Sequence, residues 1–540
     1  MLRSGAWTGA AVSLVLAWPS LGTAQTDAPA VYQQSAPVLA RYPDVPIRLD
    51  APGVAPGRTT FTSQQEMEAH LAGLKARAPR FLLGSLGSSS QGRNLPYLVF
   101  TAEGLTDLER VRRLQRPVVW LVGQQHGNEP AGGEAMLALA SALADGELRP
   151  LLRRMTVVVV PRANPDGAAA FSRVTAQGFD LNRDHLLATL PESRALQAFM
   201  RRLPPDVMVD AHEYGVAGGW ITRLGGLAPW DATLLHATHP EVPEDSTALA
   251  QSLFGPAMDA RLREAGLSSH VYLTLGGQGR TIQTGGAAPG ISRNYYGLTG
   301  AVSFLVETRG IGIGRQSFQR RVATHYQAAK AVLETVAREP GRVRRTVAQA
   351  RRDLARDRSP LVVGHTLEPI QETLPMVDPE TGREKPVDVT IQDSRRLRVT
   401  ATRPRPQGYL LAPGAASAVE AFRIKGMRVC RVRSTAPVAV EAFRVRRTAP
   451  ITRATREATN LEQTLEVSVE GRTVSPSSGW VYVPMAQEGS AVAAASLEPD
   501  SVGSHVGVGL IEPAADGIAP VYRVPVGAKR PRLSGGPGCR

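Results

Sequence analysis

A short loop in the first third of the chain carries two side chains of the kinds that bind metal ions. It contains His126-Gly-Asn-Glu129, follows the apolar run 118–122 and precedes a segment, 134–145, with the pattern of a helix. A neutral imidazole and a carboxylate at the carboxyl end of a buried strand supply the nitrogen and oxygen ligands that zinc takes at about 2.0–2.2 Å. The loop therefore predicts half of a zinc site.

The third ligand is expected at the end of another strand. A hydrolytic zinc site has three protein ligands and an open position for water, and the apolar run 207–209 is followed by Asp210-Ala-His212. Metal-bound histidines usually donate their second N–H to a carboxylate. Asp180 and Asp210 are the candidates for that position, although an aspartate at a strand end is equally typical of a turn. We expect His212 to complete the ligand set, with one zinc ion per chain.

A general base should accompany the metal. Zinc lowers the pKa of its water to about 7, but hydrolysis of an amide also needs a group that takes up a proton and passes it to the leaving nitrogen. Glu307 follows the apolar run 301–306 and should face the same rim as the zinc. The alternative is a structural ion pair between Glu307 and Arg309.

A candidate carboxylate-binding pair lies between the first and third ligands. The segment Asn164-Pro-Asp-Gly167 is by itself a turn signal, and Asn182-Arg183 follows it. Arginine binds a carboxylate through two parallel hydrogen bonds, and asparagine adds another donor. Such a pair near zinc would select substrates that have a free carboxylate.

Strands and helices that could position these residues alternate between residues 61 and 338. The predicted strands are 97–101, 118–122, 155–160, 207–210 and 301–306. Continuous apolar runs with helices between them indicate a sheet that is covered on both faces. We therefore predict an α/β catalytic domain.

The rest of the chain has a different character. An arginine-rich stretch near residues 342–358, interpreted as a solvated helix, precedes short segments of β-branched residues and prolines. One string, Val-Glu-Ala-Phe-Arg, occurs at 419–423 and again at 440–444. The copies could be paired strands, but two short matches do not establish a repeat. The predicted organisation is a signal peptide (1–24), a leader or linker (25–60), the catalytic domain (61–338), a basic helix and linker (339–384), a β-rich accessory domain (385–526) and a disordered tail (527–540).

Composition and the first residues bear on location. A basic start, an apolar stretch near 10–18 and small residues at Gly22 and Ala24 are typical of a secretory signal cleaved after Ala24. We expect an exported protein, periplasmic or secreted, with no integral membrane segment after cleavage. Cys430 and Cys539 could pair in an oxidising compartment.

The net charge is +14, but only 5% of residues are aromatic, so nucleic-acid binding lacks support.

Taken together, these segments resemble the zinc metallocarboxypeptidase family typified by carboxypeptidase A, over roughly residues 61–338. The matching pieces are Gly87-Ser-Ser-Ser-Gln-Gly92-Arg93, His126-Gly-Asn-Glu129, Asn164-Pro-Asp-Gly167, Asp180-Leu-Asn182-Arg183, Asp210-Ala-His212 and Phe304-Leu-Val-Glu307. The resemblance implies a mixed β-sheet flanked by helices, and a peptide substrate with a free C-terminal carboxylate.

The resemblance also implies roles for individual residues. His126, Glu129 and His212 would hold zinc, Asp180 would orient His126, and Glu307 would act as general base and acid. Asn182 and Arg183 would bind the terminal carboxylate of the substrate. An arginine upstream of them would polarise the scissile carbonyl, and Arg173 occupies that part of the chain.

Some features depart from the family pattern. The active-site tyrosine of the family lies farther upstream of the glutamate than Tyr295 or Tyr296 do here, so that role is unfilled. The segment between Asn164 and Asn182 is short, and His185 is either a pocket residue or an exposed one.

Two rival interpretations remain open. Related zinc deacylases of N-acyl amino acids share the ligand loop and the Asn-Arg pair, and cell-wall peptides are a possible substrate of the same chemistry. A binding protein that keeps the fold without the activity is the alternative outside enzymology.

Overall fold

The largest sheet of the protein is mixed and has eight strands. The computed structural model describes residues 31–457, 465–535 and 539, so the predicted signal peptide lies outside the described residues. The strand order is β1-β2-β4-β3-β5-β10-β6-β7. The strands are β1 (Leu82–Ser88), β2 (Asn94–Phe100), β3 (Val118–Gly123), β4 (Thr156–Val160), β5 (Val207–Gly215), β6 (Ala232–His236), β7 (Ser269–Val271) and β10 (Val302–Ile311). Strands β4, β3, β5 and β10 run parallel. The pairs β1–β2, β2–β4 and β6–β10 are antiparallel, and β7 pairs in parallel with β6.

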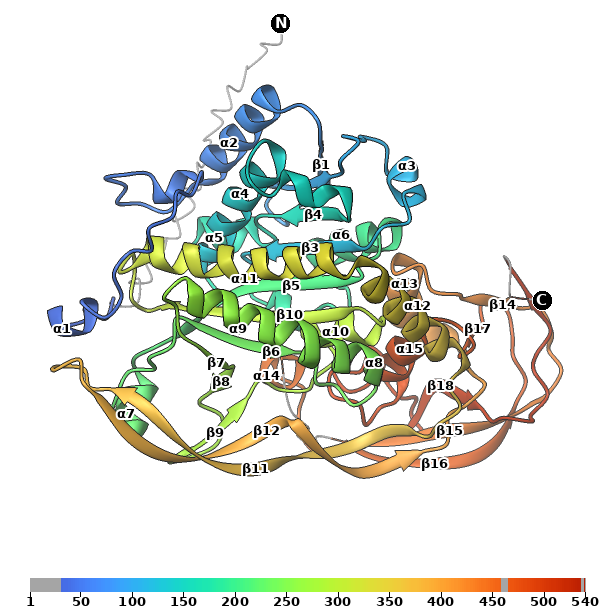
Figure 1. The fold of residues 1–540 in the computed structure, drawn as a ribbon. Coiled ribbons are helices and arrows are strands. Elements are labelled where there is room, and N and C mark those ends of the chain that lie inside the picture. The colour runs from blue at the N-terminus through green and yellow to red at the C-terminus, as the bar shows by residue number, and fades with distance from the viewer. Residues whose placement is uncertain (1–30, 458–464, 536–538, 540) are drawn as a thin grey trace, which may run out of the picture.

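Helices cover both faces of this sheet (Figure 1). Successive side chains of a strand point to opposite faces, so Val157 and Val159 of β4 pack in one apolar cluster and Val158 and Val160 in another. The first cluster includes α2 (Gln64–Arg77), α4 (Pro130–Ala144), α9 (Gly255–Glu264), α11 (Phe318–Arg338) and α12 (Pro340–Arg356). The second includes α3 (Leu108–Arg113), α6 (Pro191–Arg202), α10 (Ser292–Leu298) and α15 (Ser490–Leu497). This two-sided burial confirms the predicted α/β class.

A long hairpin forms a second sheet beside the first. Strands β11 (Leu361–Val377) and β12 (Glu384–Arg403) pair antiparallel, and β12 continues the sheet through β9 (Thr281–Thr284) to β8 (Leu273–Thr274). We expected a helix and linker over 339–384; α12 is present, but β11 occupies the end of that segment. Pro369 and Pro375 lie within β11, and prolines inside a run argue against a strand in sequence-based interpretation.

The C-terminal part contains a third sheet, which agrees with the predicted β-rich region. Its order is β16-β15-β18-β13-β17-β14-β19. The strands are β13 (Gly408–Leu411), β14 (Cys430–Val432), β15 (Val438–Arg447), β16 (Leu465–Val474), β17 (Val481–Pro484), β18 (Ile518–Val524) and β19 (Leu533–Ser534), and the helices in this part are α13 (Ala416–Ile424), α14 (Arg453–Arg456) and α15. The two Val-Glu-Ala-Phe-Arg copies are not paired strands, because the first lies in α13 and the second in β15. Packing therefore overrides local preference in this string.

Both ends of the described chain are attached to the body. Residues 31–60 contain α1 (Ala36–Leu39) and a short 3₁₀ turn, and Gln319 donates a hydrogen bond to Val45 O at 2.9 Å. The segment from residue 527, expected to be disordered, instead contains β19, which pairs with β14. Cys539 forms a disulfide with Cys430 across a separation of 109 residues. Strand pairing and the cross-link therefore attach Leu533, Ser534 and Cys539 to the rest of this sheet.

The remaining helices are α5 (Pro165–Ala169), α7 (Gly219–Leu224) and α8 (Glu244–Leu249). Within the described ranges, no helix combines the length and apolar character needed to cross a bilayer.

Candidate active site

Three buried side chains place potential metal ligands within reach of one another. Nδ1 of His126 lies 2.7 Å from one carboxylate oxygen of Glu129, and Nδ1 of His212 lies 2.9 Å from the other. The two Nδ1 atoms are 3.0 Å apart. Within the described part of the chain, these three residues form the only group with ligand atoms close enough for a metal ion.

The outer nitrogens of both histidines face carboxylates. Nε2 of His126 lies 3.0 Å from Asp180, and Nε2 of His212 lies 2.9 Å from Asp210. If each Nε2 carries the proton, each Nδ1 presents a lone pair to the carboxylate of Glu129. Acceptors that converge in this way need a cation between them, so the donor set fits a zinc ion.

Asp210 is held by a buried chain of side chains. Gln125 donates to Asp210 at 2.7 Å, His185 Nε2 donates to Gln125 at 2.8 Å, and Gln197 donates to His185 Nδ1 at 3.2 Å. Burial lowers the pKa of His185 to about 4, so the ring is neutral and can donate and accept at once. His185 is therefore a buried member of this network rather than an exposed residue.

The ligand loop is locked against the Asn-Pro-Asp-Gly turn. A Cβ at Gly127 would lie 1.8 Å from the carbonyl carbon of Gly167. The side chain of Asn164 accepts a hydrogen bond from Gly167 N at 2.9 Å and caps α5. These glycines explain why the two motifs occur together, since only backbone without side chains can approach this closely.

The turn is also fixed from the opposite direction. Asp166 accepts hydrogen bonds from Ser89 and from Arg93, both at 2.7 Å. The early glycine- and serine-rich segment is therefore connected to the ligand loop through the turn, although it is far from the metal ligands in sequence.

Glu307 lies beside the ligand set. In the parallel pairing of β10 with β5, Glu307 and His212 are register partners. Burial raises the pKa of the Glu307 carboxyl to about 7, and the neighbouring Glu129 carboxylate acts in the same direction. Arg309 does not pair with Glu307; it donates to Gln34 at 2.8 Å and its guanidinium lies 3.3 Å from the centre of the Tyr42 ring. The alternative interpretation of Glu307 as a structural ion-pair member is therefore wrong.

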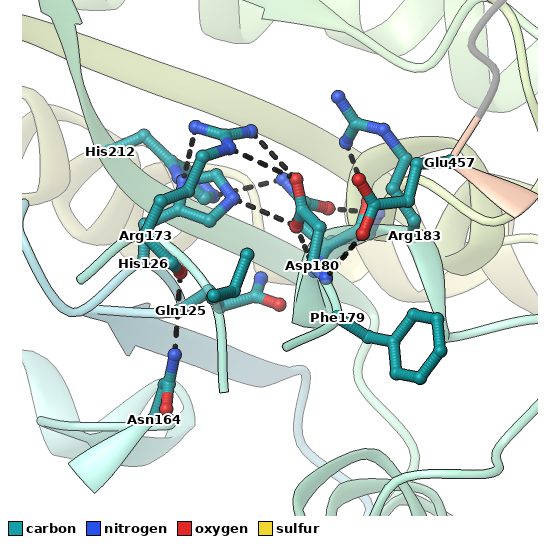
Figure 2. Close-up of polar contacts among 12 residues, drawn as sticks. Gln125, His126, Asn164, Arg173, Phe179, Asp180, Arg183, His212 and Glu457 are labelled. Carbon is teal, nitrogen blue, oxygen red and sulfur yellow. Dashed lines mark hydrogen bonds and ion pairs between the residues drawn. The ribbon is translucent and has the colours of Figure 1, made fainter. Parts of the chain in front are cut away.

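A cavity of about 430 Å³ brings the other predicted residues together. His126, Arg173, Asn182, Arg183 and Glu307 all line it. Arg173 donates to Asp180 at 2.8 Å, and its Nη1 lies 3.2 Å from His126 Nδ1 (Figure 2). The guanidinium of Arg173 therefore lies next to the metal-ligand atoms, in the wall of the cavity.

The Asn-Arg pair is held in place by its surroundings. Asn182 N donates to Asp180 at 2.8 Å, and Asn182 Oδ1 accepts from Ser292 N at 2.7 Å. Asn182 Nδ2 lies 3.2 Å from His212 Nε2. Arg183 donates to the carbonyl of Asn182 at 2.7 Å. Asn182 thus contacts His212 through its side chain and is connected to His126 through Asp180.

Two residues that line the cavity, Tyr272 and Arg293, were not predicted from the sequence as site residues. Tyr272, directly after β7, and Arg293, in α10, both line the cavity, and burial raises the pKa of the Tyr272 phenol. Tyr272 and Tyr214 line the same cavity as Glu307, whereas Tyr295 and Tyr296 are buried in the core cluster. No motif surrounds Tyr272 or Arg293, so no local signal in the sequence singled them out.

The C-terminal part also reaches the site. Glu457, which follows α14, accepts a hydrogen bond from Asp180 N at 2.9 Å (Figure 2). The guanidinium of Arg456 lies 4.0 Å from the centre of the Phe179 ring and 3.2 Å from Asp184. The segment that carries Asp180 and the Asn-Arg pair is therefore packed between two parts of the chain.

Comparison with known proteins agrees with this geometry. The family model for zinc carboxypeptidases matches residues 67–319. Carboxypeptidase 2 of Trichophyton rubrum is 28% identical over 482 residues, covering 87% of this chain and 88% of the relative. Probable carboxypeptidase 2 of Arthroderma benhamiae is 30% identical over 362 residues, covering 66% of this chain and 68% of the relative. A solved carboxypeptidase A from Helicoverpa armigera is 18% identical and covers 52% of this chain and 75% of its own, with a TM-score of 0.40. The chain therefore belongs to the zinc carboxypeptidase family.

Proposed function

We propose that this zinc metallocarboxypeptidase is exported and removes the C-terminal residue of peptides, with Glu307 as general base and acid. The observation that carries the proposal is the placement of Glu307 beside His212, in one cavity with Arg183. A base next to the metal ligands and a cation farther along the same cavity suit a peptide bond close to a free carboxylate.

The metal would be one zinc ion per chain, held by His126, Glu129 and His212, with Asp180 and Asp210 orienting the histidines. Bound zinc would polarise a water molecule and lower its pKa towards about 7. The Glu307 carboxylate would take a proton from the attacking water as the water oxygen bonds to the scissile carbonyl carbon, and would deliver that proton to the leaving nitrogen as the C–N bond breaks.

The arginines have separate tasks in this proposal. Asn182 and Arg183 bind the terminal carboxylate of the substrate. Arg173, fixed by Asp180 next to the metal-ligand atoms, donates to the oxygen of the scissile carbonyl as negative charge develops there. A preorganised donor of this kind lowers the activation free energy by about 3 to 4 kcal/mol.

Paired substrates test the reaction. Peptides with a free C-terminus should be cleaved, and the same peptides with an amidated C-terminus should not. Faster turnover of N-acyl amino acids than of peptides would favour a deacylase, and no turnover of either by zinc-loaded protein would favour a binding protein.

Glu307→Gln tests the mechanism. The variant should keep one zinc per chain by elemental analysis and lose about 100- to 10,000-fold in kcat. Wild-type turnover in this variant would exclude Glu307 as the base, and zinc at full stoichiometry in His126→Ala would exclude the ligand assignment.

Export is supported by two features. The first 24 residues have the pattern of a signal peptide, and the Cys430–Cys539 disulfide is of a kind that persists in oxidising compartments. N-terminal sequencing of protein from the periplasm or the medium should begin at Gln25. Recovery of uncleaved protein in the cytoplasm alone would contradict export.

A further inference from the structure

Arg293 places a buried positive charge in the wall of the cavity. The residue is 2% exposed and belongs to α10. Its Nη2 donates to the carbonyl of Gly286 at 2.5 Å, and its Nε has no partner among the described residues. A buried guanidinium without an opposite charge is costly. An incoming anion would remove that cost.

Other buried arginines in the protein are differently placed. Arg321 pairs with Glu213 and Arg320 with Asp231, both at 2.6 Å. Arg162 and Arg309 have no carboxylate within 4 Å in the described ranges, but neither lines the cavity. Arg293 thus combines burial, a lack of a carboxylate partner and access to the substrate cavity.

Gly285 leaves the space in front of Arg293. A Cβ at this position would lie 2.9 Å from Nη2 of Arg293 and 2.9 Å from the ring of Tyr272. Any side chain other than hydrogen would therefore crowd the guanidinium. The glycine keeps this wall narrow and the charge accessible from the cavity.

Arg293 and Arg183 are held next to each other in the fold. Asn182 Oδ1 accepts a hydrogen bond from Ser292 N, so the residues just before the two arginines are joined directly. A Cβ at Gly290 would lie 2.5 Å from the carbonyl oxygen of Arg183. Burial lowers the pKa of Arg293 to about 10; the charge of Arg183 acts in the same direction, whereas the acidic groups of Tyr272, Glu307 and Asp210 act against it. Both arginines line the cavity, and neither has a carboxylate within 4 Å among the described residues. Two such cations on one wall favour a ligand with two negative charges.

We propose that Arg293 binds the side-chain carboxylate of the substrate's C-terminal residue, so that the enzyme prefers peptides ending in glutamate or aspartate. The proposal rests on the proposed function, because it assigns the terminal carboxylate to Arg183. A neutral side chain of the same shape would leave the guanidinium buried and unpaired. Discrimination by a charged hydrogen bond of this kind amounts to roughly 10- to 100-fold.

Matched substrates measure the effect directly. We would compare peptides that differ only in a terminal glutamate or glutamine, and expect kcat/KM of the wild type to be at least about 10-fold higher for glutamate. In Arg293→Gln the ratio should fall to about 1 or below, with turnover of the glutamine peptide retained. Arg293→Lys should restore part of the preference.

The control is Arg223→Gln. Arg223 donates to the carbonyls of Gly279 and Thr281, so it holds the same region without lining the cavity. This variant should keep the wild-type glutamate preference even if overall activity falls. Zinc content and melting temperature are measured for each variant.

The results separate this proposal from the proposed function. A wild type that cleaves both peptides equally overturns the role of Arg293 but keeps the carboxypeptidase. Equal losses on both peptides in Arg293→Gln also overturn it, because Arg293 would then serve the terminal carboxylate. No turnover of any free-terminus peptide would refute the proposed function instead.

If Arg293→Gln does not fold, inhibition of the wild type tests the proposal. N-acetylglutamate should bind at least about 10-fold more tightly than N-acetylglutamine, and equal inhibition would overturn the proposal.

Discussion

Replacement of Gly127 by alanine should weaken zinc binding and lower activity, although the nearest contacts of the added methyl group would be with the backbone of Gly167 and Ala168 and not with a metal ligand. Gly127 lies between His126 and Glu129, and its added Cβ would lie 1.8 Å from the carbonyl carbon of Gly167 and 2.2 Å from Ala168 N. Both contacts are with backbone, so no side-chain rotation can relieve them. The loop and the turn must move apart.

The size of that movement follows from the contact distance. An ordinary contact of 3.4 Å instead of 1.8 Å requires a separation of about 1.6 Å. Zinc sites tolerate errors of only about 0.2 Å in ligand distance, and a misplacement of about 1 Å can cost about 100-fold in rate. We therefore expect a loss of at least about 100-fold in kcat/KM and a corresponding loss of zinc affinity. Overpacking should also cost about 1–3 kcal/mol of folding stability.

The assay combines zinc content after dialysis, competition with a chromogenic chelator, and kcat/KM on a free-terminus peptide. The control is Gly73→Ala in α2, where a Cβ meets nothing within 4 Å. That variant should be stabilised by about 0.5–1 kcal/mol, because alanine is the better helix former. If Gly127→Ala kept wild-type zinc affinity and activity, the contact with the turn would not be what positions the ligand loop.

Three further predictions concern the ligands, the base and the disulfide. Asp180→Asn should weaken zinc binding about 10- to 100-fold in the chelator competition, because His126 loses a charged partner; unchanged affinity would contradict this role. Since Glu307 must be ionised and its pKa without metal is raised to about 7, activity should fall as the pH falls through its pKa, which bound zinc would lower. A pH–kcat/KM profile with no acid limb would exclude this assignment. Replacing both Cys430 and Cys539 by serine should lower stability by about 2–5 kcal/mol in denaturant titration while zinc content stays at the wild-type level, and an unchanged midpoint would argue against a stabilising disulfide.

The metal-ligand cluster could be predicted because its signals are local. His126 and Glu129 share one loop, and His212 follows a run of apolar residues that predicts a buried strand, as observed in β5. Parallel strands bring their carboxyl ends to one edge of the sheet, so three separate segments point to a common place. Glu307 followed from the same reasoning.

Other cavity residues depend on long-range packing. Arg293 reaches the cavity because Gly285, in a different segment, leaves room for it. Tyr272 lies between β7 and β8, where the chain passes from one sheet to another. Neither residue belongs to a repeating pattern. His185 was ambiguous for the same reason, since its partners Gln125 and Gln197 come from segments whose positions only the folded chain defines.

The pairing of β12 with β9 affects whether the catalytic domain can be produced without the C-terminal part, and which substitutions can change substrate specificity. The cavity residues Leu273, Thr274, Leu275 and Gln283 lie on or next to β8 and β9, while β12 comes from residues 384–403, beyond the family match that ends at residue 319. An excised segment 61–338 would leave β9 with a bare edge, which invites aggregation. Substitutions in β12 can also shift the cavity wall without contacting substrate. Substrate specificity can therefore change through substitutions in residues 384–403, which lie outside the part of the chain that matches the family.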